Sequence, residues 1–142
     1  MEEGNADRMI AELARVTRPA GRVLTVVRAT DVDWWANLPL SRELLRSINA
    51  LGPKTGAGVG QGGCADSSVY DRLIAANLKP LNLGPRFAFY RSGDRLRDVL
   101  GRLGGALPED ARSEFEAAVE LARSRGTLSV GEPFHCAISI AE

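Results

Sequence analysis

The N-terminal stretch of the chain alternates apolar and polar residues with the period of an α-helix. The apolar residues that share one face are Met9, Ile10, Leu13, Ala14 and Val16. Asn5 or Asp7 is available as the N-cap of this helix. The residue before a proline is biased away from helical geometry, so we expect about three helical turns that end before Pro19.

A β-branched run follows almost at once, Arg22-Val-Leu-Thr-Val-Val-Arg28. Its apolar residues occupy both faces of the pleat, which is typical of a strand buried in a parallel sheet. A helix, a Pro-Ala-Gly turn and such a strand form the second half of a βαβ unit. The pattern therefore predicts an α/β fold, and its opening elements are expected to lie in the middle of that fold.

The rest of the pattern predicts more helices, two further strands and one loop. Helices are expected over 40–51, from about 66 to 77, over 94–103 and over 108–125, and strands over 78–91 and 133–140. Pro80 and Pro85 lack a ladder donor, so the strand that holds them belongs at a sheet edge or carries a bulge. Residues 29–39 are expected to form a loop, and the whole chain, residues 1–142, a single domain.

Composition and charge narrow the functional class. The chain carries 18 basic and 18 acidic residues, so it lacks the basic footprint that nucleic acids and anionic membranes require. No apolar run reaches the roughly 20 residues of a membrane span, and the acidic N-terminus is unlike a secretory signal. Cys64 and Cys136 match neither a zinc motif nor a disulfide framework. These features predict a cytoplasmic protein with no nucleic-acid, membrane or metal partner.

Residues 53–64 are rich in glycine, and Gly58, Gly60 and Gly63 satisfy a G-x-G-x-x-G pattern. A cofactor loop of this kind follows a strand directly, so that its backbone N–H groups point at the ligand. Here the end of a predicted helix precedes the pattern, which favours a lid or a plain loop. Cys64 is expected to be exposed in this loop, and Cys136 to lie in the core.

Candidate binding residues follow the predicted first strand, at the sheet end where open α/β folds bind ligands. Trp34 and Trp35 are adjacent there, which suggests that one indole packs and the other lines a pocket. The alternative is that both only cover the apolar end of the sheet. Asp31 and Asp33 flank the indoles and are able to accept a substrate hydrogen bond, although loop carboxylates are more often solvated or capping.

Three further candidates belong to the later strands. His135 is the only histidine and opens the last predicted strand. An imidazole is suited to accept a proton from a hydroxyl or an acidic carbon. The alternative is a half-buried strand histidine with a backbone partner. Tyr90 and Arg91 end the middle strand and are candidate substrate-binding residues.

Two stretches carry a family resemblance. Glu12-Leu-Ala-Arg-Val-Thr-Arg-Pro-Ala-Gly-Arg-Val-Leu24 is similar to a Glu-hydrophobic-x-Arg-Val-Leu-Arg-Pro-Gly-Gly phrase, with Thr17 and Ala20 as departures. Trp34-Trp-Ala-Asn-Leu-Pro-Leu40 and Pro133-Phe-His-Cys-Ala137 are similar to a loop and a last strand that accompany it in some proteins. Together they resemble the C-terminal half of class I S-adenosylmethionine-dependent methyltransferases, in the small-molecule, ubiquinone/menaquinone-type branch.

The resemblance implies a Rossmann-like sheet in the order 3-2-1-4-5-7-6 with an antiparallel last strand, to which this chain contributes the fifth, seventh and sixth strands. The family's cofactor motifs belong to the N-terminal half, so cofactor-binding residues are not assigned here. We expect the chain to be inactive alone and to bind S-adenosylmethionine tightly only as part of a complete enzyme. The free edge of Arg22–Arg28 is then expected to self-associate or to pair with a separate N-terminal half.

The resemblance thus implies methyl transfer to a small-molecule acceptor. His135 is the candidate general base, and the candidate acceptor-binding residues are Asp33, Trp34, Trp35, Tyr90 and Arg91. In-line transfer from a sulfonium mainly requires alignment and a closed pocket. One alternative is a non-enzymatic ligand-binding or protein-interaction domain on the same half-fold. Another, an α+β domain of the polyketide-cyclase kind, would need more strands than the pattern predicts.

Overall fold

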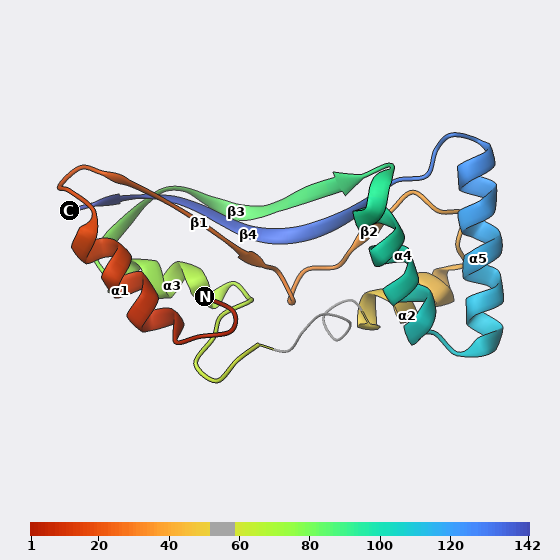
Figure 1. Ribbon diagram of the computed structural model, residues 1–142, viewed down its shortest axis with the longest axis horizontal. Coiled ribbons are helices and arrows are strands. Elements are labelled where there is room, and N and C mark those ends of the chain that lie inside the picture. Colours follow the sequence, from red (N-terminus) through yellow and green to blue (C-terminus); the bar gives the residue numbers. More distant parts are fainter. Residues whose placement is uncertain (52–58) are drawn as a thin grey trace. The chain divides into compact units, whose positions relative to one another are not determined.

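The computed structural model describes residues 1–51 and 59–142 (Figure 1). It is an α/β structure, as the pattern predicts. Its elements in chain order are α1 (Ala6–Val16), β1 (Arg22–Arg28), β2 (Trp35–Ala36), α2 (Arg42–Leu51), α3 (Ser68–Ala75), β3 (Leu78–Tyr90), α4 (Gly93–Ala106), α5 (Glu109–Ser124) and β4 (Val130–Ala141). The predicted helix stop at Gly52-Pro53 and the first glycine of the G-x-G-x-x-G pattern lie outside the described residues.

The strands form an open antiparallel sheet around β4. β1 pairs with β4 in a register that runs from Arg22 opposite Ile140 to Arg28 opposite Phe134. β2 pairs with the start of β4, and β3 also pairs with β4. Across residues 1–51 and 59–142, no strand pairs with the second edge of β1.

The two faces of β1 differ in burial, which corrects the prediction of a strand buried on both faces in a parallel sheet. Val23, Thr25 and Val27 are buried, whereas Leu24 is 68% exposed and Val26 is 51% exposed. The partner strand β4 is antiparallel. Antiparallel strands commonly have one packed face and one solvated face.

The faces of β4 and the setting of Cys64 correct two further predictions. Phe134, Cys136, Ile138 and Ile140 share one face of β4, and they are half-buried or exposed. The buried face instead carries the alternate residues His135, Ala137, Ser139 and Ala141. Cys136 is therefore not a core residue. Cys64, which was expected to be exposed, is only 2% exposed.

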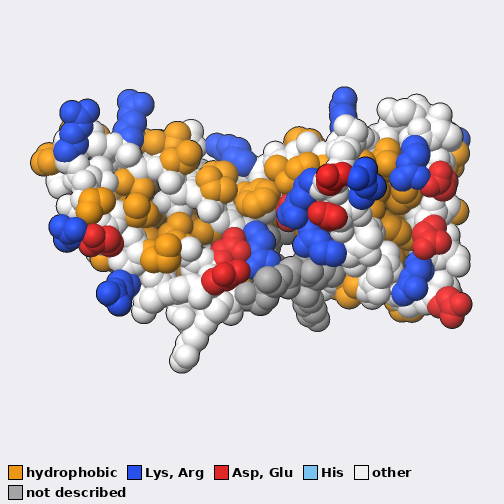
Figure 2. Space-filling model, in the orientation of Figure 1, with side chains coloured by type: hydrophobic (Ala, Val, Ile, Leu, Met, Phe, Trp, Pro, Cys, Tyr) orange, Lys and Arg blue, Asp and Glu red, His pale blue; other side chains and the backbone are white. Residues whose placement is uncertain are grey.

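The chain divides into two compact units. The first unit comprises Met1–Val32, Gly58–Arg86 and Pro133–Glu142. In its core, side chains of α1 and α3 pack on the buried face of β1 and β4; the residues are Ala6, Ile10, Val23, Val27, Cys64, Val69, Leu73, Leu78, Ala137 and Ala141. On the side of the molecule drawn in Figure 2, hydrophobic side chains also reach the surface between charged ones.

The second unit comprises Asp33–Ala57 and Phe87–Glu132. Its helices α2, α4 and α5 gather around one apolar core (Figure 1). The helix predicted over 108–125 is confirmed as α5, whose buried residues are Phe115, Ala118, Val119 and Ala122. The other large core residues are Leu44, Ile48, Leu96, Val99, Leu100, Leu103, Leu107, Leu128 and Val130.

The join between α1 and β1 shows how the local sequence sets the geometry. Asn5 caps α1 by accepting a hydrogen bond from the Arg8 backbone N–H at 2.9 Å, as predicted. Ala20 lies at a φ of 60°, in the left-handed region that favours glycine. A Cβ at Gly21 would lie 2.7 Å from the Arg18 carbonyl oxygen, so only glycine fits there.

Candidate functional site

His135 lies at the centre of a polar network in the first unit. Its side chain is 3% exposed. The ring atom Nδ1 is 2.8 Å from the Tyr70 hydroxyl, and Nε2 is 2.5 Å from Oδ1 of Asp31. The Tyr70 and His135 rings meet edge to face, with centroids 5.2 Å apart. Residues from β4, α3 and the loop after β1 therefore converge on one imidazole.

Backbone contacts hold the Asp31 carboxylate in place. The backbone N–H of Ser67, just before α3, donates to Oδ2 of Asp31 at 3.1 Å. The backbone N–H of the preceding residue, Thr30, donates to the Ala65 carbonyl at 2.9 Å, and the Thr30 hydroxyl donates to the same oxygen at 2.8 Å. The loop after β1 is thus tied to the start of α3, which fixes both partners of His135.

Charges in the network define which atoms carry protons. Burial raises the pKa of Asp31, but hydrogen bonds from His135 and Ser67 outweigh this effect and lower the pKa to about 2. Asp31 is therefore ionised near neutral pH and accepts from Nε2–H of His135. Burial raises the pKa of the Tyr70 phenol, so its O–H stays protonated and is able to donate to Nδ1 of His135.

This arrangement is chemically suited to general-base catalysis. A neutral imidazole accepts a proton at Nδ1, and an ionised carboxylate on Nε2–H stabilises the imidazolium that forms. The alternative predicted for His135, half burial with a backbone partner, is wrong: the residue is buried and its partners are side chains. Asp31 carries a clear signal as a loop carboxylate after a strand, but no feature of the sequence singles out Tyr70.

The other predicted site residues lie in the second unit or at its boundary, and Tyr90 belongs to a second polar cluster. Its hydroxyl donates to Glu132 at 3.2 Å, and Glu132 is 3% exposed. Arg95 binds the same carboxylate at 2.6 Å, and its guanidinium lies 5.8 Å from the centroid of the Tyr90 ring. The hydrogen bond to Glu132 raises the pKa of Arg95. Neither Glu132 nor Arg95 stands out in the sequence.

The two indoles differ in burial, and the prediction that one of them lines a pocket stays a prediction. Trp34 is half-buried and packs against the core of the second unit. Trp35 is 45% exposed and meets Phe89 edge to face, with centroids 5.4 Å apart. Asp33 is exposed. Arg91 is also exposed, and it lines a pocket of about 490 Å³ at the start of α4.

The glycines of the G-x-G-x-x-G pattern that the structure describes face the chain's own N-terminus. A Cβ at Gly60 would lie 2.5 Å from the Glu3 carbonyl oxygen, and one at Gly63 would lie 2.1 Å from that of Glu2. The Gly60 N–H also donates to the Glu2 carbonyl at 2.7 Å. Close backbone packing therefore accounts for both glycines without a cofactor.

Comparison with known proteins identifies no family: no protein-family model matches the chain, and no curated protein matches it either. In the part of the chain that the structure describes, no group of three or more His, Cys, Asp or Glu side chains is placed to hold a metal ion. Among those same residues, no helix is both long and apolar enough to cross a bilayer.

Proposed function

We propose that the chain is the substrate-side, C-terminal portion of a class I S-adenosylmethionine-dependent methyltransferase that acts on a small-molecule acceptor. The observation that carries the proposal is the strand arrangement. β4 pairs with both β1 and β3 and runs antiparallel to β1. The resemblance likewise implies a seventh strand that pairs with both the fifth and the sixth, and these pairings accompany the phrase from Glu12 to Leu24.

The outward edge of β1 at Leu24 and Val26 supports the same proposal. Gly21 and Ala29 form backbone hydrogen bonds with Ala141 and Pro133 of the β4 segment. Because backbone groups alternate in direction along an antiparallel strand, the N–H and C=O groups of Leu24 and Val26 point away from β4. That edge is suited to a fourth strand from an N-terminal half, and the exposed side chains of Leu24 and Val26 are suited to packing beneath its helices.

The polar network supplies chemistry that suits methyl transfer. In this proposal His135 takes, through Tyr70, the proton that an acceptor hydroxyl or acidic carbon loses as its bond to the methyl group forms. The Tyr70 oxygen accepts that proton while the Tyr70 hydroxyl gives its own proton to Nδ1 of His135. Asp31 holds the imidazole in the required tautomer through Nε2–H. S-adenosylmethionine supplies the methyl group, and the residues that bind it belong to the N-terminal half.

Calorimetry with S-adenosylmethionine tests this proposal. The chain alone is expected to show no tight binding. The chain joined behind the first four strands of a methyltransferase of this branch is expected to bind in the micromolar range. A matched fusion that carries Val26→Pro lacks one outward N–H and is expected to bind more weakly, because proline cannot donate to the added strand. Micromolar binding by the chain alone would contradict the proposal.

A second candidate is a non-enzymatic ligand-binding or interaction domain, which the exposed aromatic cluster of the second unit favours. Trp35, Phe87 and Phe89 are 45%, 38% and 59% exposed, and the last two rings stack with centroids 6.1 Å apart. Exposed aromatic side chains are common in binding surfaces. If the fusion binds no S-adenosylmethionine although circular dichroism shows that it is folded, this second function is favoured.

A further inference from the structure

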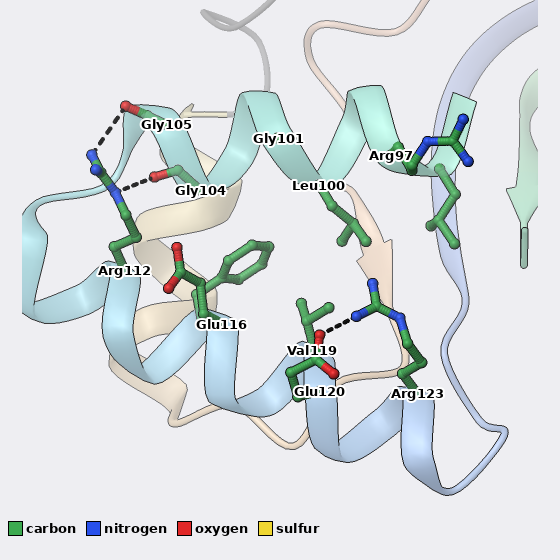
Figure 3. A pocket seen from close by; sticks show the side chains of 12 residues that line it. Arg97, Leu100, Gly101, Gly104, Gly105, Arg112, Glu116, Val119, Glu120 and Arg123 are labelled. Atoms are coloured by element: carbon green, nitrogen blue, oxygen red, sulfur yellow. Dashed lines mark hydrogen bonds and ion pairs between the residues drawn. The ribbon is translucent and has the colours of Figure 1, made fainter. Parts of the chain in front are cut away.

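Two concavities of the second unit meet at α4. The larger is a groove of about 610 Å³ between α4 and α5 (Figure 3). Its apolar lining consists of buried side chains from both helices, namely Leu96, Leu100, Phe115 and Val119. The smaller is the pocket of about 490 Å³ that Arg91 lines. Leu96, Arg97 and Arg123 line both, so the two spaces adjoin each other at these residues.

Glycines on α4 keep the groove open. Gly101 and Gly105 line it, and a Cβ at either position would meet no atom within 4 Å. A Cβ at Gly104 would only reach ordinary contact with the Phe115 ring, at 3.4 Å. The space above this part of α4 is therefore empty because the helix carries no side chains there.

Positively charged side chains gather around the smaller pocket. Arg91, Arg97 and Arg123 line the smaller pocket, and none of its described lining residues is acidic. Arg97 pairs with Asp94, and Arg123 pairs with Glu120, but all four side chains are more than half exposed. Exposed pairs of this kind are weak, so a ligand anion competes for both guanidinium groups.

The far end and the α5 side of the groove differ from the smaller pocket in the charged groups that they offer to a ligand. Figure 3 shows Arg97 and Arg123 at one end and Arg112 at the other. Arg112 donates to the carbonyl oxygens of Gly104 and Leu107, at 2.9 Å and 3.1 Å, and so serves the end of α4. Glu116 and Glu120 line the α5 side of the groove. An anion is therefore favoured only at the Arg91 end.

We propose that the adjoining concavities bind a single-chain amphiphile with an anionic head, a carboxylate or a phosphate. The head binds Arg91, Arg97 and Arg123, and the tail lies along the apolar lining over Gly101. Both volumes fall within the roughly 300–1,000 Å³ of small-ligand sites. The inference concerns α4, α5 and the residues that flank them, including Arg91, and it does not depend on the methyltransferase proposal.

Titration of the full chain with matched amphiphiles tests the site. Decanoate and decyl phosphate carry the two candidate heads on one tail, decyltrimethylammonium carries the opposite charge, and inorganic phosphate has no tail. We expect at least one anionic amphiphile to bind at least about tenfold more tightly than both controls, because charged hydrogen bonds and tail burial each contribute. The tighter of the two anions identifies the head. Equal binding of decyltrimethylammonium would overturn the proposal.

Two substitutions locate the binding. Arg91→Gln is expected to weaken binding of the preferred anion about tenfold, whereas Arg46→Gln, at an exposed arginine of α2, leaves it unchanged. Gly101→Leu fills the groove and is expected to weaken binding by a similar factor, with Ala117→Leu on exposed α5 surface as its control. If both test variants melt like the unmodified chain and bind the anion equally well, the proposed site is wrong.

Discussion

At the residue scale, Asp31 is the side chain whose charge matters most to the His135 network. Its hydrogen bonds to His135 and Ser67 form only in the folded protein, because both partners are distant in sequence. They lower its pKa from 3.8 to about 2 in spite of burial. The side chain of Asp31 is 38% exposed, so solvent screens part of this effect.

This pKa predicts a pH dependence of stability. A carboxyl group whose pKa falls on folding stabilises the folded state above its unfolded pKa, and the stabilisation is lost as pH falls through the folded value. The unfolding free energy of the unmodified chain should therefore fall more steeply between pH 4 and pH 2 than that of Asp31→Asn. Urea titrations across this range measure the difference. Asp33→Asn, at an exposed neighbour, should retain the steep fall, and parallel curves for the chain and Asp31→Asn would refute the assignment.

Ala20 and Gly21 give a second residue-scale prediction. Ala20→Gly removes the strain of a side chain at a φ of 60° and should raise the unfolding free energy by about 0.5–1 kcal/mol. Gly21→Ala should lower it, because its Cβ would lie 2.7 Å from the Arg18 carbonyl oxygen. Thermal or urea unfolding measures both. If Ala20→Gly is destabilising, the left-handed conformation at this turn is wrong.

At the scale of elements, the backbone of residues 1–3 packs directly against the backbone around Gly63. Gly63→Ala would place a Cβ 2.1 Å from the Glu2 carbonyl oxygen, so the segment must shift. We expect a loss of about 1–3 kcal/mol and new amide exchange at Cys64, whose N–H donates to the Met1 carbonyl. Gly105→Ala, on an open helix position, is the matched control and should be neutral or stabilising. Equal stability of the two variants would contradict the packing.

Most elements could be predicted from local sequence, because their signals are local. Asn5 caps α1 as one of its two predicted N-caps, although Met9, Leu13 and Val16 of the predicted apolar face are exposed. β3 holds two prolines, and its pairing with β4 fits the prediction of an edge strand. The burial of β1 could not be predicted, since it depends on which elements cover each face. β2 spans only Trp35–Ala36, which is too short for any periodicity.

The candidate site was predictable only in part, for a related reason. Tyr70 and His135 are 65 residues apart in sequence, and Asp31 and His135 are 104 apart. Contacts between such distant side chains leave no local pattern. The sequence marks His135 and Asp31 as candidates, because one opens a predicted strand and the other follows one. Tyr70 lies beside the apolar stripe of α3, and no sequence feature marks it as a candidate.

At the scale of the whole molecule, we propose that this chain supplies one part of a larger methyltransferase sheet. The proposal rests on the pairing of β4 with both β1 and β3, and on the outward edge of β1 at Leu24 and Val26, where no strand pairs among the described residues. If this is correct, the backbone N–H and C=O groups of Leu24 and Val26 have no partner strand in the isolated chain. Val23 and Val27 direct theirs to β4.

Amide hydrogen exchange in β1 tests this claim most directly. At concentrations where sedimentation shows a monomer, the account predicts fast exchange at Leu24 and Val26 and slow exchange at Val23 and Val27. When the four-strand N-terminal half of a methyltransferase is joined to the chain, Leu24 and Val26 should become protected. Slow exchange throughout residues 23–27 in the monomeric chain alone would contradict the account.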